Sequence, residues 1–179
     1  MAVELVYETH SMSVDNGRGI ATGWLPGELS EHGRAQARAL GERRRDDGIE
    51  CVFTSDLRRA VETAEIAFEG SAIEIRHDPR LRECNYGRLN GAPGGELDPR
   101  GRFVEEPFPG GESYRECVER MRLFLDDVAH EFQGSRVLVI AHSAQRWALA
   151  HLLEGVPLEE IVEAPFEWQE GWEYVVDGA

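Results

Sequence analysis

The chain has 179 residues, 41% apolar and 30% charged, which is typical of a globular domain whose core needs no disulfide support. Its formal net charge of −15 argues against a nucleic-acid partner, because phosphate-backbone binding requires a basic face. The sequence has no long apolar run and no leader-like start, so we expect no membrane span and a cytoplasmic location. Three scattered cysteines, without metal-site spacing, fit reduced thiols there.

An apolar run near the start of the chain ends abruptly at a histidine. Val3, Leu5, Val6 and Tyr7 suit a buried strand, and polar residues lead directly to His10. Much later, residues 136–140 (RVLVI) run in the same way into Ala141, His142 and Ser143. The carboxyl ends of strands in an open α/β sheet form the ligand crevice. We therefore expect both histidines at one edge of the sheet.

Between these strands, helical and extended patterns alternate. Residues 11–29 form a polar, glycine-rich loop, and Ser30 is a predicted N-cap for a helix through about Asp47. The run IECVFT (residues 49–54) predicts a buried strand, and residues 73–75 a short one. Ser55 and Asp56 offer caps for a helix that continues to Gly70.

From about residue 77 to residue 113 the apolar residues show neither a helical nor a strand periodicity, and prolines and glycines interrupt the chain. We interpret this stretch as a surface excursion that covers the site, because the α/β pattern resumes after it. Further predicted elements are a helix over 112–132, a strand over 136–141, a helix ending at Gly155, a short helix over 157–162 and a last strand within 166–176. The pattern predicts one three-layer α/β/α domain over residues 1–179, with a mostly parallel sheet.

The residues between the two histidines fit a phosphoryl-transfer site. The run DLRRAVETA (residues 56–64) opens a helix directly after a strand, so that Arg58 or Arg59 would face the crevice and bind a phosphate. All 19 basic residues are arginine, so an arginine is evidence for a phosphate site only through its position. Whichever of Arg58 and Arg59 does not face the crevice is expected to be a solvated surface residue. Glu83 is a candidate acid. A histidine metal site is the weaker alternative, since no His-Glu-x-x-His or close Cys/His spacing is present.

In combination, these motifs resemble the histidine phosphatase superfamily of phosphoglycerate-mutase-like enzymes. The resemblance covers nearly the whole chain and rests on the following stretches: His10 with Asn16 and Gly23, LSEHGRAQARAL, FTSDLRRAVETA, LRECNYG, FPGGES and VLVIAHS. It implies His10 as nucleophile, Arg59 as phosphate ligand, Glu83 as proton donor and His142 as the second pocket histidine. It also implies that Asn16 and Gly23 line the substrate pocket.

The chain departs from the family pattern beside both histidines. The family's Arg-His-Gly triplet is Thr9-His10-Ser11 here, and the glycine after the second histidine is Ser143. One phosphate-binding arginine is therefore missing, and we expect Arg18, Arg82 or, most attractively, Arg146 to replace it. The hydroxyls of both serines could donate to a phosphate oxygen. Glu8 stands where the family has an apolar residue, and it would repel an anionic substrate unless it is paired.

The resemblance implies a small phosphatase that hydrolyses a phosphate monoester without a metal or other cofactor, because the excursion is too short for the larger mutases. A pseudophosphatase that only binds a phosphorylated ligand or a protein partner is the main alternative, and a phosphomutase is the third. The sequence leaves open which ester is cleaved, whether the loss at Thr9 abolishes activity, and whether the chain is a monomer or a homodimer.

Overall fold

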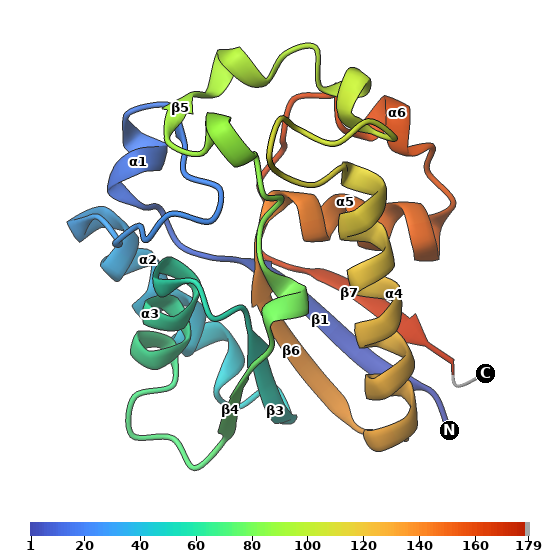
Figure 1. Cartoon of the computed structure of the whole chain (residues 1–179). Helices are drawn as coiled ribbons and strands as arrows, with labels where there is room; N and C mark the ends of the chain where they lie inside the picture. Colours follow the sequence, from blue (N-terminus) through green and yellow to red (C-terminus); the bar gives the residue numbers. More distant parts are fainter. Residues whose placement is uncertain (178–179) are drawn as a thin grey trace.

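A five-stranded sheet organises the computed structural model, which describes residues 1–177 (Figure 1). In spatial order the strands are β4 (Glu74–His77), β3 (Ile49–Thr54), β6 (Arg136–Ala141), β1 (Val3–Thr9) and β7 (Trp172–Val176). The first four are parallel to their neighbours, and β7 runs antiparallel to β1. The predicted, mostly parallel sheet is confirmed.

Helices cover both faces of this sheet, as the alternation of strand residues requires. Val6 and Val52 face α2 (Glu31–Arg44) and α3 (Arg58–Ala67), in a core cluster that includes Leu40 and Ala64. Neighbouring strand residues face the other way, toward α4 (Tyr114–Glu131) and α5 (Ser143–Glu154). The three-layer prediction is therefore confirmed.

Most helix ends follow the signals in the sequence, with one exception. Ser30 caps α2 by accepting a hydrogen bond from Gly33 N, and Gly155 ends α5 with a φ of 71°. The helix predicted to open at Ser55 and Asp56 begins only at Arg58, after Leu57 as N-cap. The Ser55 hydroxyl instead lies 2.7 Å from Nε2 of His142, so it serves the site rather than the helix.

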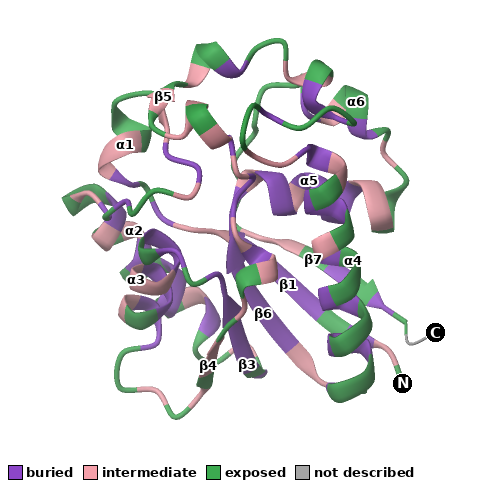
Figure 2. Ribbon diagram, in the orientation of Figure 1, coloured by how far each residue is buried: buried purple, intermediate pink, exposed green. Residues whose placement is uncertain are grey.

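Three connections lie above the carboxyl ends of the parallel strands (Figure 1). The first contains α1 (Val14–Gly17) and β2 (Ile20–Ala21), and the third contains α6 (Leu158–Ile161). The excursion supplies β5 (Ala92–Pro93), which pairs with β2, and four short 3₁₀ helices: η1 (Pro79–Leu81), η2 (Gly87–Leu89), η3 (Gly94–Leu97) and η4 (Arg100–Phe103). Figure 2 shows that these connections are far more exposed than the strands beneath them.

The last predicted strand is shorter than the sequence suggested. Only Trp172–Val176 pairs with β1, and residues 166–171 contain no strand. No helix within residues 1–177 is long and apolar enough to cross a membrane.

Candidate active site

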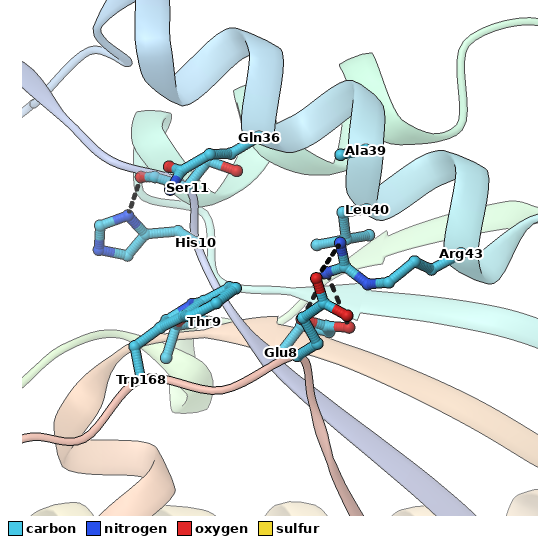
Figure 3. A pocket seen from close by; sticks show the side chains of 10 residues that line it. Glu8, Thr9, His10, Ser11, Gln36, Ala39, Leu40, Arg43 and Trp168 are labelled. Atoms are coloured by element: carbon cyan, nitrogen blue, oxygen red, sulfur yellow. Dashed lines mark hydrogen bonds and ion pairs between the residues drawn. The ribbon is translucent and has the colours of Figure 1, made fainter.

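Two cavities meet at the carboxyl end of β1. The larger has a volume of about 810 Å³ and is lined by most of the predicted site: Thr9, His10, Asn16, Gly23, Arg59, Glu83 and Ser143. The smaller, of about 140 Å³, lies between the end of β1, α2 and the segment before β7 (Figure 3). Thr9 and His10 border both cavities, so the histidine lies where the two spaces meet.

The hydrogen bonds of His10 define its tautomer. Its Nδ1 lies 2.7 Å from the Ser11 carbonyl oxygen. Because a carbonyl only accepts, Nδ1 carries the proton and Nε2 keeps its lone pair. Arg59 Nε donates to that Nε2 atom at 3.3 Å. Desolvation, together with the nearby Arg59 guanidinium, lowers the pKa of His10 to about 3, so the ring is neutral near pH 7.

Arg59 is held against His10 by the loop that follows α1. Its Nη2 donates to the Gly23 carbonyl at 2.9 Å, and the residue is 2% exposed in the first turn of α3. Gly23 has a φ of 54°, and a Cβ there would lie 1.8 Å from Oδ1 of Asn90, so only glycine fits. Arg58 is largely exposed and pairs with Glu28, which identifies it as the solvated arginine of the two.

His142 lies beside His10 but has no exposed surface. The two ring centroids are 5.1 Å apart, and His142 Nε2 lies 2.7 Å from Ser55 Oγ. Tyr7 donates its hydroxyl to the His142 carbonyl. Burial and Arg59 hold the pKa of His142 well below its usual range. Its Nδ1 has no hydrogen-bond partner among residues 1–177, although the atom is buried and His142 lines neither cavity.

The carboxyl group of Glu83 is fixed at both oxygens. Oε1 accepts from the backbone N–H groups of Cys84 at 2.8 Å and of Ala144 at 3.2 Å, while Oε2 lies 3.0 Å from Ser143 Oγ. Since Oε1 is committed as an acceptor, a proton on Glu83 resides on Oε2. Two backbone N–H donors and the Ser143 hydroxyl thus hold the carboxyl group of Glu83 in place.

None of the three expected arginines replaces the missing one at Thr9. Arg146 pairs with Glu154 at 3.4 Å and stacks on Trp172, outside both cavities. Arg82 is bound by Asp56 through two nitrogens. Arg18 is exposed and lines neither cavity.

Apart from Arg59, the guanidinium that lines the larger cavity within residues 1–177 is that of Arg100, and it pairs with Asp98 at 3.0 Å. Neither Arg100 nor Asp98 is marked by a pattern in the sequence, because both lie in the aperiodic excursion. Asn16 lines the same cavity, with its Oδ1 occupied by Ser13 N at 3.0 Å. Its NH₂ group is left as a donor.

The two serines that replace family glycines behave differently. Ser143 lines the larger cavity and directs its hydroxyl to Glu83 rather than to a phosphate site. Ser11 borders only the smaller cavity, so the structure does not bring it to the larger one with the other site residues. Its N–H donates to Thr63 Oγ1 at 3.0 Å, which fixes the start of the loop on α3.

Glu8 is 1% exposed beneath the smaller cavity, and two arginines of α2 neutralise it. Arg44 Nε lies 2.9 Å from Glu8 Oε1, and Arg43 Nη2 lies 3.3 Å from Oε2 (Figure 3 shows the pair with Arg43). Glu8 is therefore paired, as we expected it to be if the site is to accept an anionic substrate.

The site agrees with the family to which the chain belongs, the histidine phosphatase superfamily (branch 1), whose sequence profile matches residues 9–169. A 2,3-bisphosphoglycerate-dependent phosphoglycerate mutase of Methylobacterium sp. (strain 4-46) is 35% identical over 178 residues, covering 88% of this chain and 83% of that protein. The family resemblance drawn from the motifs is thus confirmed.

Solved structures of similar proteins include phosphatases. Bacillus stearothermophilus YhfR has a TM-score of 0.83 and 25% identity, covering 94% of this chain and 88% of that one. A mycobacterial glucosyl-3-phosphoglycerate phosphatase, in complex with VO3, has a TM-score of 0.77 and 30% identity, covering 88% of this chain and 85% of that one. The fold is therefore phosphoglycerate-mutase-like, with both mutases and phosphatases among its relatives.

Proposed function

We propose that this protein is a phosphatase that hydrolyses a small phosphate monoester through a phosphohistidine on His10. The observation that carries the proposal is the orientation of the His10 ring. Its Nδ1 proton is bound by the Ser11 carbonyl, and its unprotonated Nε2 lies beside the Arg59 guanidinium at the wall of the larger cavity. This is a neutral nucleophile next to a fixed positive charge.

In the first step, His10 Nε2 attacks the phosphorus in line, and the bond from phosphorus to the ester oxygen breaks. Glu83 supplies a proton from Oε2 to the departing oxygen, so the product leaves as an alcohol. Arg59 and the free Nδ1 of His142 stabilise the charge on the equatorial oxygens, provided that Nδ1 carries the proton. The proposed tautomer of His142 therefore has Ser55 donating to Nε2.

In the second step, water attacks the phosphohistidine. Glu83, now a carboxylate, accepts a proton from this water, and the bond between Nε2 and phosphorus breaks to release inorganic phosphate. His10 returns to its neutral form. Glu83 thus ends the cycle with a proton in place of the one that it donated in the first step.

Steady-state hydrolysis of p-nitrophenyl phosphate by the wild-type protein and by His10→Ala tests this function. We expect turnover by the wild type and none by the variant, which also controls for a contaminating phosphatase. Turnover that persists in the variant, or no turnover by a folded wild type, contradicts the proposal.

A pseudophosphatase remains the second candidate, and Thr9 is the observation in its favour. With a threonine there, the Arg59 guanidinium contacts His10. The other arginine that lines the larger cavity, Arg100, is paired with Asp98. Losing one charged donor at such a site costs roughly 10²–10³-fold in rate. Phosphate binding without phosphorylation of His10 would identify this function. Isomerised phosphate ester in place of free phosphate would identify the phosphomutase instead.

A further inference from the structure

The larger cavity has an aromatic wall that the proposed chemistry does not use. Phe166 and Trp168 are 39% and 56% exposed, and both line the cavity together with His10. They belong to residues 163–168, which lie between α6 and β7 and all line this cavity except Glu167. Large exposed aromatic side chains that gather at the mouth of one cavity are typical of a ligand surface rather than of a core.

The two aromatic residues are supported in different ways. The Phe166 ring packs against Trp172 with a centroid distance of 6.2 Å, and Trp172 in turn packs against Tyr7 at 6.1 Å. Phe166 is thereby anchored to the sheet. Trp168 has no ring partner among the described residues, and it borders the smaller cavity together with Thr9 (Figure 3). Its indole is therefore the free aromatic surface nearest to the residue that precedes the nucleophile.

The charged side chains of Asp98, Arg100 and Glu163, which line the larger cavity, do not suit a second anionic group on the ligand. Asp98 and Glu163 line it, and the cation there, Arg100, is neutralised by Asp98 at 3.0 Å. Arg59, which also lines the cavity, contacts His10. A leaving group that carries a carboxylate or another phosphate would meet the carboxylates of Asp98 and Glu163, and the Arg100 guanidinium beside them is already paired.

We propose that this cavity selects phosphate monoesters with an uncharged aromatic leaving group, which stacks on Trp168 and contacts Phe166. The inference rests on the proposed phosphatase function and names its substrate class. Aromatic stacking provides affinity, and the negative charge that Glu163 adds beside the Asp98–Arg100 pair disfavours anionic leaving groups such as the glycerate of phosphoglycerate. The reaction that supplies the substrate must accordingly phosphorylate an aromatic alcohol.

Binding of phosphonates, whose carbon–phosphorus bond is not hydrolysed, tests the inference without requiring turnover. Calorimetry would compare benzylphosphonate, methylphosphonate and carboxymethylphosphonate. We expect benzylphosphonate to bind the wild type roughly tenfold more tightly than methylphosphonate, and carboxymethylphosphonate to bind most weakly. Trp168→Ala should remove the preference for the benzyl group, whereas Trp168→Phe should retain most of it.

Leu123→Ala is the matched control, because Leu123 is 44% exposed on α4 and lines neither cavity. It should leave the preference unchanged. Equal binding of the benzyl and methyl compounds to the wild type, binding of neither, or a preference that survives Trp168→Ala would overturn the inference. A benzyl preference without hydrolysis of any ester would instead refute only the phosphatase function. Hydrolysis without the preference would refute only the aromatic selection.

Discussion

The two histidines follow strands of the same form, yet the chain after each takes a different path. After β1, a long loop over residues 11–29 opens the space beside His10, which borders both cavities. After β6, α5 begins at once and His142 is fully buried against Ser55. A strand that ends in histidine therefore delivers the ring to the edge of the sheet. The connection that follows decides how much of that ring is open to the cavities.

The largest effect that this comparison predicts is the difference between substituting His10 and substituting His142. His10→Ala should abolish both turnover and phosphorylation of the protein. His142→Gln keeps an amide near Nε2 and loses Nδ1, so it should lower kcat roughly 10²–10³-fold while the protein is still phosphorylated. His142→Asn, which keeps an amide near Nδ1, should lose less. Equal losses in the Asn and Gln variants would show that Nδ1 has no special role.

The missing arginine offers a gain of function at the His10 end of the comparison. Thr9 borders both cavities, so a guanidinium introduced there would lie beside His10. We expect Thr9→Arg to raise kcat by up to about 100-fold, by restoring a charged donor to the transferring phosphoryl group. Thr9→Gln, of similar length but uncharged, is the control. An unchanged rate in Thr9→Arg would mean that existing groups already neutralise the substrate.

At the His142 end, Ser143 should have a smaller effect that passes through Glu83. Removal of its hydroxyl by Ser143→Ala leaves Glu83 Oε2 without its side-chain partner and should lower kcat about tenfold, with KM nearly unchanged. In the Glu83→Gln background the same substitution should cost little, because the two residues act as a unit. Additive losses in the double variant, measured by steady-state kinetics, would separate Ser143 from Glu83.

Stability should fall in acid because both rings are held neutral. Each histidine has a folded pKa below its unfolded value of about 6.5, so the unfolded chain binds more protons as the pH falls below that value. The free energy of unfolding then decreases by at most about 1.4 kcal/mol per pH unit and histidine. Both histidines should contribute to this slope down to about pH 4, because the folded pKa of His10 is about 3 and that of His142 also lies well below 6.5.

Urea unfolding from about pH 7 to about pH 4 measures this slope. It should be shallower in both His142→Gln and His10→Ala than in the wild type. A slope that neither substitution changes would assign the acid sensitivity to the carboxylates.

The sequence predicted the elements whose periodicity and end signals agree. Residues 49–54 and 136–141 are strands with the predicted bounds, and Ser30 caps α2 as expected. The later start of α3 was not predictable, because the Ser55 hydroxyl is used by a residue 87 positions away. Within the site, the motif residues His10, Arg59, Glu83 and His142 do lie together.

The sequence does not predict the direction in which a side chain points, nor which residues of an aperiodic segment line a cavity. Arg146, in the first turn after His142, faces Glu154 and Trp172 because helical geometry turns it away from the cavity. Arg100 lies in the excursion, where no period marks it. Trp168 lies in a stretch for which the sequence predicted a strand. Only the residues from Trp172 onward pair with β1, so Trp168 lies outside the strand and lines the cavity.

The covalent intermediate is the most direct test of the central claim that His10 is a neutral nucleophile. The protein would be mixed with p-nitrophenyl phosphate and quenched in alkali, in which phosphohistidine survives, and its intact mass and phosphorylated peptide would be measured. The account predicts one added phosphoryl group, lost in acid, on His10 of the wild type and of His142→Gln, and none in His10→Ala. A phosphoryl group on another residue, or none on any variant while hydrolysis proceeds, would contradict it.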